Sequence, residues 1–374
     1  MNAVERMRRM FEGGPVDHLP RVGFGYFPQT FARWKREGLP EETLKDWSKF
    51  GALMGFDPSP WGGQAVDLGW CEAPVSPTYE EKILRVEGEH EIVQDWVGRI
   101  KEYPKGVREQ VMPTYLKHAV ASWADWENDV RPRLDPETPA RWKDYEKKVA
   151  ANRQAIAGEG LLHNAGVIGG YMYMRSLVGP VELLYLFHDD PKLVHSLMET
   201  WRHLMITGLT RVQRDVGPFF RLYFGEDICY NHGPLISPAM MREFLMPYYR
   251  DLYQTLRAGQ KETLHFEIDT DGDCRPVIPV FQEIGVDAMS PFEVASGCDV
   301  VEIGRQYPAF HIRGGIDKRI LAAGPDAIDR MLDRIMPVMV ARGRYIPCED
   351  HAVPEDVSLA SYMHYRERVM QLDH

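Results

Sequence analysis

The chain has few cysteines, and their number and spacing exclude two common kinds of site. They are odd in number, widely spread over 374 residues, and no two of them form a Cys-x-x-Cys pair. A disulfide framework or a structural zinc module of the usual spacing is therefore not expected. Free thiols in a reducing compartment are the simplest interpretation. The five are Cys71, Cys229, Cys274, Cys298 and Cys348.

Long apolar runs and an excess of basic residues are also missing. No uncharged stretch approaches the ~20 residues that a membrane-spanning helix needs, and the charged segment Met1–Gly14 lacks the apolar core of a signal peptide. With 44 Lys and Arg against 55 Asp and Glu, the formal net charge is -11. That charge disfavours nucleic acid and anionic membranes as partners. We expect a cytoplasmic protein that acts on a small-molecule substrate.

The periodicity of the second half predicts a parallel sheet. From about residue 160, strand-like runs alternate with helical segments, which indicates βαβ units. We expect one domain over residues 1–374, an α/β protein of the (β/α)8 TIM barrel class with N-terminal elaborations; a doubly wound sheet is the alternative. No Gly-x-Gly-x-x-Gly follows these strands, which counts against a dinucleotide-binding sheet. The predicted strands are 161–168, 219–224, 263–268, 286–290, 309–313 and 344–347, and the predicted helices are 180–188, 191–216, 238–258, 275–284, 299–306 and 324–342.

The first hundred residues predict additional elements. An amphipathic helix is expected over 2–12 and a strand from Leu19 to Phe27. The runs Lys82–Val86 and Glu91–Val97 alternate between apolar and polar residues like two antiparallel strands. We interpret the segment that contains them as an elaboration on the barrel.

The densest group of polar residues lies in the predicted strand near residue 265. His265, Glu267, Asp269 and Asp271 occupy every second position, so on an extended strand they would share one face. Because unpaired polar groups inside a barrel are unfavourable, the pattern leaves two interpretations. Either this strand lines a polar site, or its end is a surface turn rich in Asp and Gly.

Other candidates follow other predicted strands, at the end of a barrel where functional groups are found. Glu226 could be catalytic or a helix-capping charge. Arg313 could hold a substrate carboxylate or phosphate, or simply pair with Asp317. Cys348 and His351, three residues apart, could bind a metal or act as acid and base. A buried structural cysteine is the alternative for the thiol.

Several segments together resemble proteins of the uroporphyrinogen decarboxylase superfamily over nearly the whole chain. That resemblance implies a (β/α)8 barrel with its pocket at the carboxyl ends of the strands. The matching segments are Glu5–Met7 with Asp17–Pro20, Gly233–Phe244 with Pro247–Tyr249, Gly285–Ala288 with Pro291–Glu293, Gly314–Lys318, and Tyr345–Asp356.

The superfamily contains two known activities, and the resemblance does not choose between them. One is the cofactor-free decarboxylation of uroporphyrinogen acetate side chains. The other is zinc-dependent methyl transfer between a corrinoid protein and a thiol or another acceptor, and related members serve O-demethylation. The arginine-rich segment that grips the tetrapyrrole in the decarboxylases corresponds here to Arg21–Pro28, which keeps one arginine. Together with the net charge, this counts against a multiply anionic tetrapyrrole.

The zinc motif of the methyltransferases is altered in this sequence. Aligning the motif's glycine with Gly272 places its two first ligands at Asp269 and Asp271, and its third at Cys348. The resemblance therefore implies a divalent metal site, zinc included, with two carboxylates in place of a histidine and a cysteine. Without a metal, two neighbouring aspartates would raise one pKa and give an acid beside a base.

The first functional hypothesis is a metal-dependent methyltransferase that passes a methyl group from a small methoxylated or methylated compound to a corrinoid protein. The alternative is a metal-free decarboxylase or lyase acting on a small organic acid, and a binding protein on a barrel without activity is a third. A homodimer is expected from the superfamily alone. The expected catalytic residues are Asp269, Asp271, His351 and Glu226, the expected substrate-binding residues Arg313, Tyr26 and Glu293, and the expected metal ligands Asp269, Asp271 and Cys348.

Overall fold

The centre of the protein is a sheet of six parallel strands, in the order β12-β11-β10-β9-β6-β5. The structure is a computed structural model that describes residues 1–108 and 111–374. The pairing sets Gly225 opposite Asp269, and Asp269 opposite Ser290, so the carboxyl ends of three neighbouring strands are level. The strands are β5 Asn164–Ile168, β6 Arg221–Gly225, β9 His265–Thr270, β10 Ala288–Pro291, β11 His311–Arg313 and β12 Tyr345–Ile346.

Two extended segments complete the ring of eight. Trp61 forms a parallel bridge with Leu162 beside β5, and Tyr26 forms one with Val353 beyond β12. A backbone hydrogen bond joins the two segments to each other. The (β/α)8 barrel predicted from the sequence is therefore confirmed, with two of its eight positions occupied by chain that makes single bridges instead of full ladders.

The helices surround this barrel and contribute most of its apolar core. In the longest helix, α9, the buried residues Leu193, Leu197, Trp201 and Leu204 are three or four positions apart, as one face of an α-helix requires. Within the described ranges, no helix has the length and apolar character needed to cross a membrane. The helices are α1 Ala3–Glu12, α2 Pro28–Arg36, α3 Glu41–Lys45, α4 Trp47–Leu53, α5 Trp123–Asp125, α6 Tyr145–Glu159, α7 Gly170–Val178, α8 Pro180–Asp189, α9 Pro191–Val216, α10 Pro238–Phe244, α11 Met246–Ala258, α12 Ile278–Gln282, α13 Val300–Gln306, α14 Lys318–Ala322, α15 Pro325–Arg342 and α16 Leu359–Leu372, with short 3-10 or π turns at Trp126–Val130, Arg131–Leu134, Pro139–Trp142 and Val294–Ser296.

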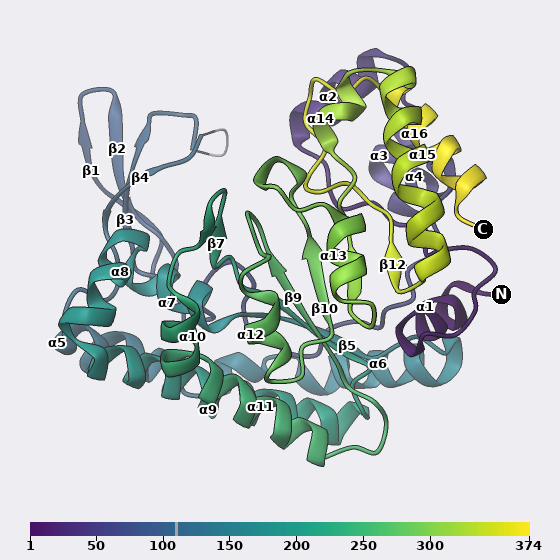
Figure 1. The fold of residues 1–374 in the computed structure, drawn as a ribbon. Coiled ribbons are helices and arrows are strands. Elements are labelled where there is room, and N and C mark those ends of the chain that lie inside the picture. The colour runs from purple at the N-terminus through teal and green to yellow at the C-terminus, as the bar shows by residue number, and fades with distance from the viewer. Residues whose placement is uncertain (109–110) are drawn as a thin grey trace.

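The predicted elaboration is an antiparallel sheet that projects from the barrel (Figure 1). It contains the two expected strands and two more, in the order β1-β2-β3-β4. A two-stranded hairpin, β7 with β8, lies in the loop after β6. These strands are β1 Lys82–Glu87, β2 His90–Gln94, β3 Ile100–Pro104, β4 Thr114–Lys117, β7 Cys229–Tyr230 and β8 Gly233–Pro234.

Three predicted elements differ from the structure. The strand expected over Leu19–Phe27 is extended chain with one bridge, at Tyr26. The helix expected over 238–258 is divided at Leu245 into α10 and α11, because Pro247 in the first turn of α11 has no N–H to continue the hydrogen-bond ladder. The helix expected over 275–284 is shortened at both ends to α12.

Helix α1 closes the end of the barrel where the strands begin. Its buried residues Met7, Met10 and Phe11 belong to a small apolar cluster at that end. The ring of Phe11 packs against the imidazoles of His265 and His311, with centroids 4.7 and 4.5 Å apart. The opposite end, where the strands finish, is therefore the end that a small molecule can enter.

Strand β9 lines the interior with the polar residues that the sequence singled out. His265 lies at the closed end, where its Nδ1 is 2.7 Å from Asp287 Oδ2. Glu267, in the middle, forms a buried ion pair with Arg221. Asp269 and then Asp271 reach the open end. The alternation thus marks an inward face whose polar residues have charged or hydroxyl partners, and the surface-turn interpretation is wrong for the strand itself.

Candidate active site at the barrel mouth

A pocket of about 380 Å³ opens at the carboxyl ends of the strands. Its residues come from β6, β9 and β11 and from the loops that follow segments of the ring, so distant parts of the sequence meet here. Aromatic and acidic side chains make up most of its wall. The lining residues are Phe24, Trp70, Cys71, Met172, Tyr223, Gly225, Glu226, Asp227, Asp269, Asp271, Arg313 and His351.

Asp269 is the acid with the most defined surroundings in this pocket. Its Oδ2 accepts hydrogen bonds from the hydroxyl groups of Tyr223 and Ser290, the latter at 2.7 Å. Burial raises the pKa of Asp269 to about 6, although both hydroxyl groups favour the charged form and oppose the shift. Near neutral pH this carboxyl can therefore exist in either protonation state, which suits a general acid or base.

Asp271 and His351 form a second acid–base pair at the rim. The imidazole Nε2 lies 3.3 Å from Asp271 Oδ2, and both side chains are about one-third exposed. The hydrogen bond to Asp271 raises the pKa of His351 above its usual value. The imidazole is consequently the more ready of the two to carry a proton between solvent and the pocket.

Glu226 lines the pocket but is fully buried, and its carboxylate is occupied by neighbouring hydrogen-bond donors. Its carboxylate accepts hydrogen bonds from the N–H groups of Tyr171 and Met172, at the start of α7, and from the hydroxyl of Tyr249. Burial raises its pKa to about 7. A Cβ on Gly169 would approach its Oε2 to 2.1 Å. Because every acceptor position is used, we assign Glu226 to the positioning of α7 against β6.

Of the three predicted substrate-binding residues, one lies in the pocket and two lie outside it. Arg313 lies in the pocket. Glu293 lies outside it, where Oε2 accepts from the N–H of Gly272 and Oε1 is 3.2 Å from Lys318 Nζ. Glu293 therefore holds the turn that carries Asp271. Tyr26 also lies outside, since its hydroxyl contacts that of Tyr362 at 2.6 Å within an aromatic cluster.

The three metal ligands predicted from the resemblance do not converge. Within the part of the chain that is described, Asp269, Asp271 and Cys348 do not form a set whose donor atoms lie within 4.8 Å of one another. Cys348 is fully buried, and burial raises the pKa of its thiol to about 12 although Arg313 opposes the shift. A cation there would meet a neutral thiol beside a guanidinium. These residues therefore do not fit the expected metal site.

One set of possible ligands does converge among the described residues, at the closed end of the barrel. Donor atoms of His265, Asp287 and His311 lie within 4.8 Å of one another. However, Arg344 Nη1 approaches His311 Nε2 to 2.9 Å, and Phe11 covers both rings. A guanidinium in contact with the ligand disfavours a cation, so we interpret this group as a polar closure of the barrel.

Two groups that complete the site were missed from the sequence. Tyr223 and Ser290 orient Asp269, and each lies on a strand next to β9. A signal for Tyr223 was present, because in the run Arg221–Gly225 it is two positions from Arg221 and so shares its inward face. Ser290 is the last residue of the predicted strand 286–290, at the edge where functional groups are expected. Trp70, whose ring packs on Tyr223 with centroids 4.7 Å apart, is on a loop that periodicity does not describe.

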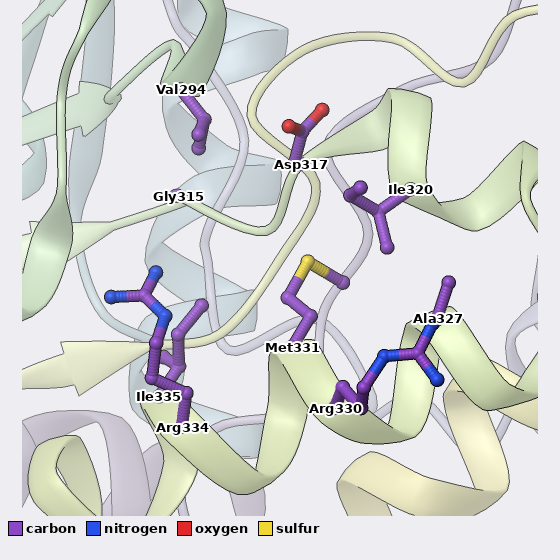
Figure 2. A pocket seen from close by; sticks show the side chains of 9 residues that line it. All are labelled: Val294, Gly315, Asp317, Ile320, Ala327, Arg330, Met331, Arg334 and Ile335. Carbon is purple, nitrogen blue, oxygen red and sulfur yellow. The ribbon is translucent and has the colours of Figure 1, made fainter.

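A second hollow, of about 320 Å³, lies outside the barrel beside α14 and α15. Figure 2 shows Ile320 extending from α14 and Met331, Arg330 and Arg334 extending from α15. Two of its charged groups are already paired, since Asp317 binds Arg319 and Arg334 binds Asp299. It contains none of the predicted acid–base residues, so the mouth pocket is the candidate active site. The hollow is lined by Val294, Gly315, Asp317, Ile320, Ala327, Arg330, Met331, Arg334 and Ile335.

Known proteins resemble this chain in fold and, over part of its length, in sequence. The structure of a methyltransferase from Methanosarcina mazei covers 99% of this chain and is itself covered to 99%, with a TM-score of 0.60 and 13% identity. At that identity the likeness shows a shared fold. Uroporphyrinogen decarboxylases from Rhodococcus erythropolis and Rhodococcus jostii are 28% and 26% identical over 154 residues.

The matched stretch is 40% of this chain and spans only 39% of the length of each Rhodococcus relative. A match to the model of a whole protein family covers more of the chain than these matches to single relatives. The family model for uroporphyrinogen decarboxylase (URO-D) matches residues 108–372, which is well over half of the chain and includes all six paired barrel strands. The chain therefore belongs to the uroporphyrinogen decarboxylase (URO-D) family.

Proposed function

We propose that this protein is an enzyme that removes a methyl group from a small methoxylated or methylated compound in the mouth pocket and passes it to a corrinoid protein. The observation that carries the proposal is the Asp269 carboxyl. It is held by Tyr223 and Ser290 at Oδ2, and its pKa is raised to about 6. Among the described residues, Oδ1 receives no hydrogen bond, which leaves it available to a substrate.

The chemistry needs a proton donor at this position. When an O–CH3 bond breaks, both of its electrons remain on the oxygen, which becomes a poor leaving group unless it is protonated. The protonated form of Asp269 would give its proton to that oxygen as the methyl group departs, so that the ether becomes an alcohol or phenol. A corrinoid carried by a partner protein would supply the nucleophile that accepts the methyl group.

The proton must then be replaced, and the rim pair is suited to that role. His351 lies in the same pocket as Asp269 and is partly exposed to solvent. Asp271 favours its protonated form. We propose that His351 carries a proton from solvent into the pocket after each turnover, and that Asp271 positions it.

The shared fold with the methyltransferase from Methanosarcina mazei supports the reaction class without identifying its substrate. The proposal requires no divalent metal at Asp269, Asp271 and Cys348, whose donor atoms do not converge among the described residues. The possible homodimer stays a prediction.

Decarboxylation of a small organic acid is the second candidate, and one observation favours it. Arg313 lines the same pocket as Asp269, so a carboxylate and a proton donor could meet there. In that reaction the C–CO2⁻ bond breaks, and Asp269 would protonate the carbon that keeps the electron pair.

An assay that follows both products separates the two candidates. Purified protein is supplied with methoxylated compounds and a reduced corrinoid protein, and both the demethylated product and released CO2 are measured. We expect demethylation in the wild type and a loss of about 100-fold or more in Asp269→Asn. The exposed acid Asp326, in the first turn of α15, provides a control, and Asp326→Asn should behave as the wild type. Release of CO2 without demethylation would reject the proposal in favour of the second candidate.

A further inference from the structure

Arg313, whose side chain is about one-fifth exposed, differs from the buried Arg221 in having no hydrogen-bonded carboxylate among the described residues. Arg221, the first residue of β6, is hydrogen bonded to Asn164 and Glu267. The guanidinium of Arg313 lies beside the thiol of Cys348, which burial keeps neutral by raising its pKa to about 12, and the nearest carboxylate oxygen in the described ranges, Glu267 Oε1, is 3.7 Å away. Glu267 is already paired with Arg221. Arg313 is thus a cation in the pocket wall whose charge is not neutralised by a carboxylate of its own.

The surroundings of Arg313 orient its guanidinium. The group lies over the ring of Phe24, 5.5 Å from its centroid, and 5.6 Å from the ring centroid of Tyr223. Rings that cover the faces of a guanidinium leave its N–H edge as the part that can bind an anion. A carboxylate fits that edge in plane, through two parallel hydrogen bonds.

The pocket's own carboxylates limit how much negative charge can enter. Asp227 is paired with Arg175 at 2.9 Å, and Asp271 is paired with His351. Each still adds negative potential at the rim. A ligand with one carboxylate can be balanced by Arg313, whereas a second or third anionic group would face these acids without a partner.

The walls favour a flat apolar body next to that carboxylate. Phe24, Tyr223 and Trp70 all line the pocket, and Trp70 packs on Tyr223. A planar ring gains from stacking between such side chains, beyond the area that it buries. The carboxylate of an aromatic acid is coplanar with its ring, so stacking and the in-plane contact to Arg313 can be made together.

We infer that the substrate is a small aromatic monocarboxylate, with its carboxylate on Arg313, its ring among Phe24, Tyr223 and Trp70, and its reacting oxygen directed toward Asp269. This inference rests on the proposed function for the reacting oxygen only. Binding of the carboxylate and the ring does not depend on which bond is broken.

Calorimetric titration of the full-length protein tests the inference with defined probes. Benzoate should bind at least about tenfold more tightly than benzamide, which keeps the ring and loses the charge. It should also bind more tightly than cyclohexanecarboxylate, which keeps the charge and loses the flat ring, and more tightly than phenyl phosphate, which carries a second charge. Equal affinity for benzoate and benzamide would overturn the role of the charge, and equal affinity for benzoate and cyclohexanecarboxylate would overturn the aromatic class. Stronger binding of phenyl phosphate than of benzoate would contradict the inference and show that the site recognises a phosphate in place of a carboxylate.

Variants of Arg313 identify the cation. Arg313→Gln should remove the preference for benzoate over benzamide, and Arg313→Lys should keep part of it, because the charge remains and the paired hydrogen bonds are lost. Arg242→Gln, which removes an exposed arginine paired with Glu283, should leave the preference unchanged. If Arg313→Gln does not fold, Arg313→Lys and Phe24→Leu still decide the question. Wild-type affinity for benzoate in both would contradict the inference.

Turnover separates a failure of this inference from a failure of the proposed function. If methoxybenzene is demethylated as readily as 4-methoxybenzoate, the carboxylate is not recognised and the inference fails, while the proposed function stands. If benzoate binds as expected and 4-methoxybenzoate is not demethylated, the proposed function fails and the substrate class stands.

Discussion

The hydroxyl of Tyr223 on β6 donates a hydrogen bond to Asp269 on the neighbouring strand β9, and both residues line the mouth pocket. The bond favours the charged carboxylate, while burial favours the neutral acid and dominates. Strand pairing fixes the two residues because Tyr223 is opposite Glu267, one inward position before Asp269. The balance between the two effects sets the protonation of the proposed acid.

Tyr223→Phe should therefore raise the pKa of Asp269 above its present value of about 6. Asp269 donates a proton only in its neutral form, so the limb of the kcat/KM profile that falls with increasing pH should move to higher pH. We expect the maximal rate to decrease about tenfold because the carboxyl loses one of its two orienting contacts. Tyr230→Phe, at an exposed tyrosine on β7, is the control. A falling limb that stays in place would mean that Asp269 is not the titrating group.

Asp271→Asn should move the same limb in the opposite direction. The hydrogen bond to Asp271 is the largest cause of the raised pKa of His351. Losing that bond lowers the pKa of His351, so the imidazole loses its proton at a lower pH. The pH profile of the variant measures this shift. In an His351→Gln background, Asp271→Asn should have only the smaller effect that comes from losing its charge near Asp269, whose pKa that charge raises. Independent, additive effects would argue against the proposed pair.

The sequence predicted the inward face of β9 well because that face depends on a local rule. A strand alternates its side chains, so His265, Glu267, Asp269 and Asp271 had to lie on one side, and the barrel made that side the interior. The same rule could have located Tyr223. The position of Arg313 at the end of β11 followed from the requirement that parallel strands present their carboxyl ends together.

The sequence could not predict which acid is sealed and which is available. Glu226 follows β6 and Asp269 lies near the end of β9, and only the structure shows that α7 begins directly over Glu226 and uses its carboxylate as a cap. Cys348 was chosen by resemblance, but its side-chain direction depends on packing, and it lies buried beside Arg313. Tyr26 lies outside the pocket for the same reason, since its ring packs among aromatic residues of the adjacent α2 and the distant α16.

Removal of metal should leave activity intact, because the three ligands suggested by the resemblance do not converge. We expect protein dialysed against a chelator to keep its rate, and Cys348→Ala to contain as much metal as the wild type. Elemental analysis by mass spectrometry alongside the assay measures both. A stoichiometric metal that is lost in Cys348→Ala together with activity would restore the ligand set that the sequence suggested.

Glu226 should make the protein less stable as the pH rises toward neutrality. Its folded-state pKa is raised to about 7 from an ordinary value of 4.5, chiefly by burial. Between these values the folded state binds more protons than the unfolded state, so the stabilisation is complete below pH 4.5 and is lost as the pH passes 7. The shift corresponds to about 3 kcal/mol.

Urea unfolding at several pH values between these limits tests that contribution. Glu226→Gln should flatten the dependence of the unfolding free energy on pH. Asp269 has a pKa shifted in the same direction, so the comparison is best made in an Asp269→Asn background. An unchanged slope in Glu226→Gln would show that the carboxyl is not the source.

Gly314, next to Arg313, should not tolerate a side chain. Its φ is +116°, and an added Cβ would lie 1.9 Å from the carbonyl oxygen of Pro291, so the chain would have to move on both sides. We expect Gly314→Ala to lower the unfolding free energy by about 2–4 kcal/mol. It should also weaken benzoate binding, because a shift of this turn displaces the guanidinium of Arg313.

Gly158→Ala is the matched control: Gly158 lies in α6, and a Cβ there would meet nothing within 4 Å. It should be neutral or stabilising by up to about 1 kcal/mol. Equal unfolding free energies for the two variants would contradict the close approach of β10 and β11 at the base of the pocket.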